Sequence, residues 1–398
     1  MRFQDIIGQQ EVISQLRGMV KENRLSHALF FLSKPGAGGL SLAMALSQYL
    51  VCEKINKPEA GSHFLFESID HSAQSIPDDA CGICPACVKA SSMIHPDIHF
   101  SYPVITKKSG DKPVSTDFIQ DWREFVKQFS YGNAYDWMQF IGAENKQGNI
   151  TAHECNEIIR MLNLKSFESG YKILIMWMPE YLGNEGNKLL KLIEEPPPDT
   201  LFILVAEDES KILNTILSRT QLIRIPALQI TDIEKALIEK AKAEPEKARM
   251  AAAVSEGSYR EALQILQHAE SDWLEMIRNW LNAALRTGPA EQMKWVNETS
   301  ALGREKQKQM IRYFHHLLEL CVRLRILGRD LVIGPVVELD FAERFNKSTS
   351  MGQQQVIMEE LDKSVYHIER NANAKILFTA LTIRLYHIIK DNVITELA

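Results

Sequence analysis

The segment CGICPAC contains three cysteines at the spacing of a metal site. Cys81, Cys84 and Cys87 form two overlapping C-x-x-C pairs, whose tight turns can direct thiolates toward a single ion. A tetrahedral zinc ion takes four such ligands, and Cys52 upstream is the expected fourth. The sequence therefore predicts a structural zinc module within residues 52–100.

Two histidines, His71 and His95, are close enough in the sequence to compete with Cys52 for the fourth position. A catalytic zinc would need an open coordination position and a nearby general base, and no residue pattern here indicates either. Six cysteines in 398 residues are too few for a disulfide scaffold. Cys155 and Cys321 stand alone in apolar surroundings, so we expect them to pack in a core.

The segment FLSKPGAGGLSLA, residues 31–43, resembles a phosphate-binding loop without its phosphate-binding side chains. On the pattern G-x-x-x-x-G-K-[ST], the second glycine is Gly38, the lysine position is Gly39 and the hydroxyl position is Leu40. That lysine contacts the β- and γ-phosphates, and that hydroxyl binds Mg²⁺. Backbone N–H groups at a helix N-terminus still attract anions, so Gly36 and Gly38 are candidates for weak nucleotide binding. A tight strand-to-helix turn, which requires glycine for its backbone conformation, explains Gly36 and Gly38 better than nucleotide binding does.

Three apolar runs are predicted to form the strands that position these residues. They are SHALFFLS (26–33), YKILIMWM (171–178) and TLFILVAED (200–208), and a helical stretch follows each of them. Alternation of short apolar strands with helices is typical of a parallel sheet covered on both faces. The segment 104–147 is polar at its start and is predicted to form an inserted loop and helix, for which the sequence indicates no role.

Beyond Pro226 the strand signals largely end, and the chain is predicted to be helical. Residues 230–270 are expected to form short helices, and longer helices follow them. One apolar face of a long helix, with spacing i, i+4, i+7, i+11 and i+14, contains Met310, Phe314, Leu317, Cys321 and Leu324. We expect this face to lie in a core or in a subunit contact.

Composition and charge limit the function classes. Hydrophobic residues make up 45% and charged residues 24%, as in ordinary globular proteins. No apolar run has the length of a membrane span, and the polar N-terminus is unlike a secretory signal, so a cytoplasmic location without membrane contact is expected. The net charge of −6 argues against a chain that surrounds duplex DNA by itself. A local excess of basic residues in 301–330 could contact DNA or an acidic neighbour, although such charges more often form a solvated helix face.

The order of several motifs along the chain is informative as well. In sequence order they are FQDIIGQQEVISQLRGMVKENRLSHALFF, the glycine segment, CGICPAC, HPDIHF, NKLLKLIEEPPPDTLFILVAED and ILSRT. The closing RNANAKILFTALTIRL (370–385) completes the set. Together these motifs cover most of the chain and resemble the bacterial clamp-loader subunits, which are AAA+ proteins.

This resemblance implies a three-part architecture. Residues 1–228 would form the α/β AAA+ core, a parallel sheet with helices on both faces, with the zinc module inserted at about 52–100. Residues 229–271 would form a small helical lid domain, and residues 272–398 an all-helical collar or oligomerisation domain.

The resemblance also implies that the nucleotide site is degenerate. In the motor subunits of the family, an acidic pair at the end of the Walker B strand holds Mg²⁺. Here the stretch ILIMWMPEYL places Trp177 and Met178 at those positions, and Glu180 follows two residues later. Gly39 and Leu40 replace the Walker A lysine and hydroxyl. Without these groups, ATP binding is expected to be weak or absent, and hydrolysis absent.

The resemblance also matches Arg219, Arg260 and the pair Glu207 and Asp208 to functional positions of the family. Arg219, in Ser-Arg-Thr, matches the arginine finger that enters the ATP site of a neighbouring motor subunit, with a surface ion pair as the alternative. Arg260 stands at the sensor-2 position of the lid, where a phosphate contact and a structural ion pair are both open. Glu207 and Asp208 fall near the sensor-1 position, which usually holds Thr or Asn, so that function is in doubt.

The implied function is that of a non-hydrolysing stator subunit in a pentameric clamp loader, which loads a sliding clamp onto primed DNA. The expected partners are the gamma/tau ATPase subunits, the delta subunit, the clamp and, mainly through the complex, primer–template DNA. The chain would belong to the DNA-directed DNA polymerase III holoenzyme without ATPase or polymerase activity of its own. An active gamma/tau-type ATPase is the main alternative, and a zinc-dependent nucleic-acid hydrolase is the other.

Overall fold

The computed structural model describes residues 1–56, 77–106, 110, 112–143, 146, 148–267, 273–332, 335–370 and 372–392. Contacts divide the chain into two compact units, Met1–Leu263 and Gln264–Ala398. The predicted lid falls largely in the first unit, and its separation as a domain of its own stays a prediction. His71, an alternative metal ligand, lies outside the described residues.

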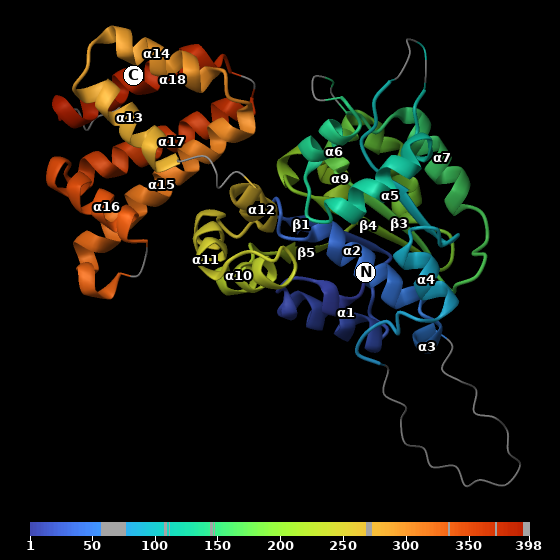
Figure 1. Cartoon of the computed structure of the whole chain (residues 1–398). Coiled ribbons are helices and arrows are strands. Elements are labelled where there is room, and N and C mark those ends of the chain that lie inside the picture. The colour runs from blue at the N-terminus through green and yellow to red at the C-terminus, as the bar shows by residue number, and fades with distance from the viewer. Residues whose placement is uncertain are drawn as a thin grey trace, which may run out of the picture. The chain divides into compact units, whose positions relative to one another are not determined.

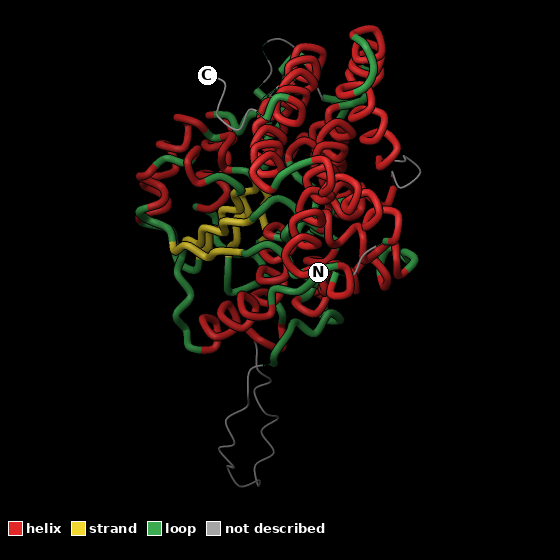
Figure 2. The backbone as a smooth tube through the Cα atoms, turned by 90° about the vertical axis from the view of Figure 1, so that its left-hand side faces the viewer, coloured by secondary structure: helices red, strands yellow, loops and turns green. Residues whose placement is uncertain are grey.

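The first unit is built on a five-stranded sheet (Figure 1). Its strands are β1 (Ala28–Ser33), β2 (Ile98–Ser101), β3 (Lys172–Trp177), β4 (Thr200–Ala206) and β5 (Gln221–Ile225). They lie in the order β2-β3-β4-β1-β5, and every neighbouring pair is parallel. Figure 2 shows the strands side by side with helices around them. The predicted parallel sheet is confirmed, and the three apolar runs supply its central strands.

The helices of the first unit outside the lid are α1 (Gln10–Lys21), α2 (Gly39–Val51), α3 (Glu53–Asn56), α4 (Pro85–Ser91), α5 (Ile119–Gln128), α6 (Ala134–Phe140), α7 (Ala152–Leu162), α8 (Leu190–Glu194) and α9 (Asn214–Leu217). The 3-10 turn η3 (Pro179–Tyr181) directly follows β3. Every residue of α2 is buried, since its largely apolar sequence packs against β1, β3 and β4 on one side and α4 on another.

Alternate residues of the central strands enter two separate cores, because side chains along a strand point to opposite faces. Phe31 and Ile175 lie in the core that also contains side chains of α1, α2, α5 and α6. Phe30 and Met176 lie in the core that contains side chains of α7, α8 and α9. Cys155 is buried in this second core, as predicted.

The segment predicted to be an inserted loop and helix contains two α-helices, α5 and α6. Aromatic side chains attach them to the sheet: the ring of Trp122 stacks on Tyr102 at 4.0 Å, and Trp137 meets Trp122 edge-on at 5.3 Å. Helix α6 begins with a capping box, in which the N–H of Asp136 donates to Asn133 Oδ1 (3.1 Å) and the N–H of Asn133 donates to Asp136 Oδ2 (3.0 Å). The carboxylate of Asp136 is therefore fixed in place by local sequence.

The lid contains three helices, α10 (Ile230–Glu239), α11 (Pro245–Val254) and α12 (Tyr259–Gln267). The lid contacts the N-terminal segment of the first unit. The ammonium group of Lys240 donates to the carbonyl of Asp5 at 2.7 Å. These contacts join the lid to the N-terminal segment.

The second unit is helical throughout its described residues. Its helices are α13 (Trp273–Leu285), α14 (Pro289–Ser300), α15 (Arg304–Leu327), α16 (Val336–Ser348), α17 (Met351–Glu369) and α18 (Ala374–Lys390). The predicted apolar face of α15, including Cys321, is buried. Trp280 and Trp295 stack in this core at 4.6 Å. None of the helices in the described part of the chain is long and apolar enough to cross a membrane.

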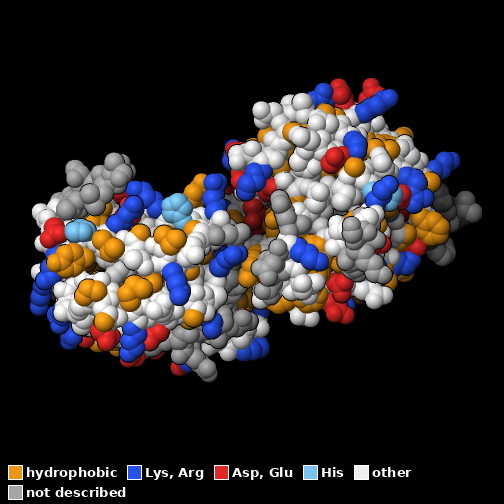
Figure 3. Space-filling view, turned by 90° about the horizontal axis from the view of Figure 1, so that it is seen from above, with side chains coloured by type: hydrophobic (Ala, Val, Ile, Leu, Met, Phe, Trp, Pro, Cys, Tyr) orange, Lys and Arg blue, Asp and Glu red, His pale blue; other side chains and the backbone are white. Residues whose placement is uncertain are grey.

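Several arginines of the basic stretch 301–330 are paired within the second unit. Arg325 donates to the carbonyl oxygens of Asn346 (2.9 Å) and Thr349 (2.8 Å) at the end of α16. Arg329 pairs with Glu343 at 3.1 Å. In the face seen in Figure 3, Lys and Arg side chains are scattered among acidic and hydrophobic ones. Arg325 and Arg329 thus have partners within the second unit, and a DNA contact of the stretch stays a prediction.

Candidate functional site: a filled nucleotide cleft, a cysteine cluster and an exposed arginine

The glycine turn lies between β1 and α2, and its glycines are required by space as well as by backbone conformation. Gly36 (φ +73°) and Gly38 (φ +94°) adopt left-handed conformations that favour glycine. A Cβ atom on Gly38 would lie 2.6 Å from Cε1 of Tyr131, and one on Gly36 would collide with the hydroxyl of Ser258. The turn is therefore packed against the segment before α6 and against the lid.

Tyr131 occupies the space in front of the turn. Its hydroxyl accepts a hydrogen bond from the N–H of Ile7 (2.8 Å), and its ring meets the ring of Tyr259 edge-on at 5.2 Å. Burial raises the pKa of Tyr131 well above the ordinary value, so the phenol is neutral. The remaining cavity, which Ser33, Gly38, Leu40, Ser130, Tyr131, Met178 and Glu207 help to line, measures about 20 Å³. This is room for roughly one water molecule.

The Walker B positions are part of the hydrophobic core. Trp177 and Met178 are buried, and the Trp177 ring lies 5.2 Å from Trp122 and 5.9 Å from Phe125. Both of these partners belong to α5. Trp177, at one of the positions predicted to match the acidic pair, thus helps to hold α5 against the sheet. Leu40 is buried in the same core.

Glu180 follows Met178 by two residues and is oriented by the end of β4. One of its carboxylate oxygens accepts hydrogen bonds from the N–H groups of Glu207 (2.6 Å) and Asp208 (2.9 Å), so Glu180 closes the end of β4. Glu207 lines the cavity, where burial first, and then the carboxylate of Glu180, raises its pKa to about 8. Asp208 accepts a hydrogen bond from the N–H of Ser210 and pairs with Lys211 at 3.0 Å.

Arg260 forms a buried ion pair with Asp136. Its Nε and Nη2 atoms donate to the two carboxylate oxygens, the latter at 2.6 Å. Only 5% of the Arg260 side chain and 10% of the Asp136 side chain are exposed. Of the two interpretations open for Arg260, the structural ion pair is the one observed.

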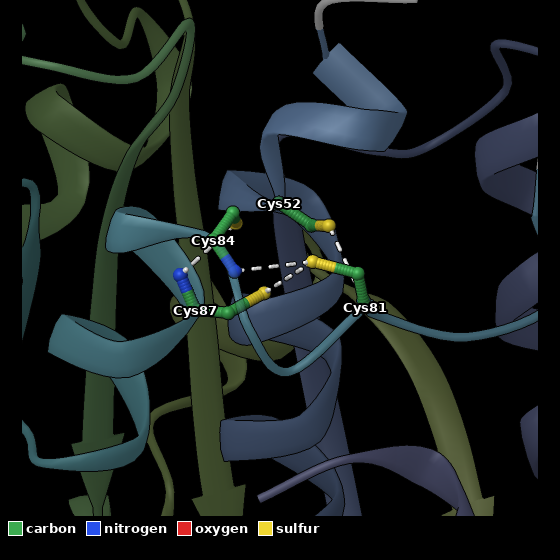
Figure 4. A group of neighbouring side chains, drawn as sticks. All are labelled: Cys52, Cys81, Cys84 and Cys87. Carbon is green, nitrogen blue, oxygen red and sulfur yellow. Dashed lines mark hydrogen bonds between the residues drawn. The ribbon is translucent and has the colours of Figure 1, made fainter.

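Four cysteines form one cluster, as the sequence predicts. Cys52 ends α2, Cys81 lies in the following loop, and Cys84 and Cys87 begin α4 (Figure 4). Their sulfur atoms all lie within 4.8 Å of one another, and those of Cys81 and Cys87 are 3.9 Å apart. Tetrahedral zinc–thiolate bonds of about 2.3 Å would place the sulfurs about 3.8 Å apart. The donor set therefore fits a zinc ion.

Hydrogen bonds in the cluster favour the thiolate form. The N–H groups of Cys81, Cys84 and Cys87 each donate to another cysteine's sulfur at 3.4 Å. Burial raises the pKa of Cys52 and Cys87. At Cys81 burial acts in the same direction, but backbone N–H donors outweigh it and lower the pKa to about 7.

His95 has a structural environment of its own. It is buried, and its Nδ1 accepts a hydrogen bond from the N–H of Asp97 at 3.2 Å. Asp97 in turn accepts hydrogen bonds from the N–H groups of Glu168 and Ser169, both at 2.8 Å. The HPDIHF segment thus fixes the loop before β3, and within the described residues the metal-ligand group consists of the four cysteines.

Arg219 lies between α9 and β5, in a different loop from the glycine turn. Its Nε donates to Glu194 at 3.1 Å, and its Nη1 donates to the carbonyl of Thr215 at 3.0 Å. The side chain of Arg219 is 33% exposed, and the side chain of Glu194 is 57% exposed. The guanidinium is therefore oriented by its neighbours yet accessible from solvent.

Sequence reasoning missed Tyr131 and Asp136, the two residues that fill and close the cleft. A signal was present in the aromatic spacing of Phe118, Trp122, Phe125 and Phe129, which describes one face of an amphipathic helix. That signal indicates a helix packed on a core. It does not indicate which site the following residues enter.

A five-stranded parallel sheet with helices on both faces defines an α/β protein. The family described as "DNA polymerase III, delta subunit" matches residues 8–229, more than half of the chain, and the chain belongs to this family. This finding confirms the predicted resemblance to clamp-loader subunits.

Individual relatives are more distant. The DNA polymerase III subunit delta' of Bacillus subtilis is 26% identical over 262 residues, which are 66% of this chain and 60% of that protein. The delta' subunit of Pseudomonas aeruginosa is 26% identical over 53% of this chain and 45% of its own length. The subunit tau of Escherichia coli is 24% identical over 83% of this chain and 45% of its own length. The chain thus spans about half the length of these relatives.

Proposed function

We propose that this chain is a non-hydrolysing, delta-prime-like subunit of a replicative clamp loader. Its membership of the DNA polymerase III delta family and its delta' and tau relatives support a place in that assembly. Its partners would be gamma/tau-type ATPase subunits, a delta subunit and the sliding clamp, with primer–template DNA contacted mainly through the complex. Such a role belongs in the cytoplasm.

The observation that carries the proposal is the burial of Trp177 and Met178 in the core shared with α5. Catalysis of phosphoryl transfer is almost entirely positioning and charge stabilisation by lysine, metal and carboxylates. Here the metal-binding positions hold apolar side chains packed against rings.

A steady-state ATPase assay of the purified chain with Mg²⁺ and primed DNA tests this proposal. We expect no turnover above background. Turnover that persists through further purification and is lost on Gly38→Ala would refute it and favour the gamma/tau-type alternative. That alternative draws support from the tau relatives, which align over more of this chain than the delta' relatives do.

The proposal assigns Arg219 to the ATP site of an adjacent motor subunit. Its pairing with Glu194 is solvent-exposed, and exposed ion pairs are worth little, about 0–1 kcal/mol. A neighbour's phosphate can therefore replace Glu194 at small cost. The planar guanidinium is suited to this because it remains charged and can donate two parallel hydrogen bonds to phosphate oxygens.

The proposal also assigns a structural zinc ion to Cys52, Cys81, Cys84 and Cys87. Such an ion would supply no chemistry to a substrate, because four thiolates complete its tetrahedron. It would link the C-terminal end of α2 to the N-terminal end of α4. The alternative of a zinc-dependent hydrolase needs an open coordination position, which a four-cysteine set does not leave.

A further inference from the structure

We infer that residues 130–136 act as a built-in occupant of the nucleotide cleft, which holds the lid on the core without any nucleotide. In this arrangement Tyr131 fills the cleft, and Asp136 provides the negative charge that the lid arginine binds. The inference concerns the single chain, so it does not depend on the proposed role in a clamp loader.

The first step is the attachment of this segment to the core. The hydroxyl of Ser41, in the first turn of α2, donates to the carbonyl of Ser130 at 2.8 Å. The next residue, Tyr131, is held by the N–H of Ile7 and lies against Gly38. The segment therefore covers the N-terminal end of α2, where the backbone of a phosphate-binding loop would meet its anion.

The second step is the attachment of the lid to the segment. The N–H of Tyr259 donates to the carbonyl of Gly36 at 3.1 Å, and its ring contacts that of Tyr131. Arg260 binds both carboxylate oxygens of Asp136. Because the capping box of α6 already fixes Asp136, the carboxylate is oriented before the lid arrives.

The third step is the consequence of burial. Removing the lid from the core would separate Arg260 from Asp136 and break an ion pair that is almost completely shielded from solvent. Separation of the partners of a buried pair is strongly unfavourable when either charge stays buried. The lid is therefore docked in every nucleotide condition, whereas a lid that depends on a bound phosphate would loosen when the nucleotide leaves.

Hydrogen–deuterium exchange on the full chain tests the inference. In Asp136→Asn, we expect buried lid amides such as those of Ala236, Leu237 and Ala262 to exchange at least tenfold faster, with β1 and β4 unchanged. The matched control is Asp121→Asn, an exposed aspartate on α5, which should exchange like the wild type. Millimolar Mg²⁺-ATP should leave the exchange of the wild-type lid unchanged.

Two outcomes would overturn the inference: lid exchange in Asp136→Asn equal to the control, or slower lid exchange in the wild type with Mg²⁺-ATP. If amide exchange in β1 and β4 is also faster in Asp136→Asn, a second variant, Arg260→Lys, decides. Arg260→Lys keeps both charges of the ion pair but lacks the planar guanidinium that donates two parallel hydrogen bonds. Lid exchange at least threefold faster than wild type with unchanged strands supports the lock. Lid exchange equal to wild type contradicts it.

Discussion

Single residues give the glycine turn a packing role that is independent of phosphate. Gly38 leaves room for the ring of Tyr131, and Gly36 leaves room for Ser258. Trp177 replaces an acidic position with a ring that packs on α5. Each departure from the phosphate-binding pattern thus coincides with a packing contact. The glycines are retained for close approach and for positive φ.

Gly38→Ala should destabilise the protein by about 1–3 kcal/mol, because alanine is strained at φ +94° and its Cβ meets Tyr131. Urea denaturation measures the change. Adding Tyr131→Ala should remove part of the penalty, with a coupling of at least about 0.5 kcal/mol. The matched control is Gly18→Ala within α1, where no atom lies near the new Cβ, so it should be neutral or stabilising. Equal effects of the two alanines would contradict this account.

Glu207→Gln should change how stability depends on pH. The pKa of Glu207 is about 8 in the folded chain and about 4.3 in an unfolded one, so the folded state binds the proton more tightly. Stability from this group is present below about pH 4.3 and is lost as the pH rises through 8. The glutamine variant should therefore gain stability relative to wild type between pH 5 and 8. Denaturation at several pH values checks this. The control is Glu209→Gln at an exposed position, whose stability relative to wild type should not change with pH.

At the scale of elements, the sequence predicts the sheet's centre better than its edges. The runs at β1, β3 and β4 are apolar at all but one position each because both faces are buried, and such runs stand out. Strand β2 has only four residues, IHFS, and β5 alternates exposed and buried positions in QLIRI. Edge strands of this kind carry weak signals.

The cysteine cluster was predictable because three of its four candidate ligands lie close together in the sequence. The Asp136–Arg260 pair was not, since 124 positions separate the partners.

The cysteine cluster joins α2 to α4, so loss of the proposed zinc ion should destabilise both helices. Wild-type protein should contain about one zinc ion per chain, and Cys84→Ser should contain much less, because a tetrahedral site needs four ligands. Metal analysis decides this, and a chelator should lower the melting temperature of the wild type only. Cys155→Ala, a buried cysteine outside the cluster, should keep its zinc. Equal zinc content in Cys84→Ser and wild type would disprove the assignment.

At the scale of the whole molecule, two units with separate cores divide the expected tasks. The first unit carries the filled cleft, the cysteine cluster and Arg219. The second is an all-helical unit whose core includes Trp280, Trp295 and the buried face of α15. Under the proposed function, the chain would offer surfaces and one arginine to an assembly. Its contribution to ATP turnover would then be measurable only with its partners present.

Arg219→Ala should lower clamp-dependent ATP turnover and clamp loading in a reconstituted loader while leaving folding, zinc content and assembly intact. A decisive arginine finger is worth about 10³–10⁵ in rate at its own site. Only one of several sites would depend on Arg219, so the total rate should fall partly. Arg219→Lys should rescue poorly because an ammonium lacks the planar fork.

The matched control is Arg160→Ala, since Arg160 is another exposed arginine paired with a glutamate. It should behave like wild type in both assays. Normal assembly with wild-type activity in Arg219→Ala would identify Arg219 as a structural residue.

The pairing of Asp136 with Arg260 also has a consequence for how the chain is made. Synthesis proceeds from the N-terminus, and 124 positions separate the two residues. At about 5–20 residues per second, Asp136 leaves the ribosome about 6–25 s before its partner does. Strands β3, β4 and β5 also follow Asp136 in the chain, so most of the sheet is synthesised during the same interval. This ion pair can therefore close the cleft only after the lid has been translated.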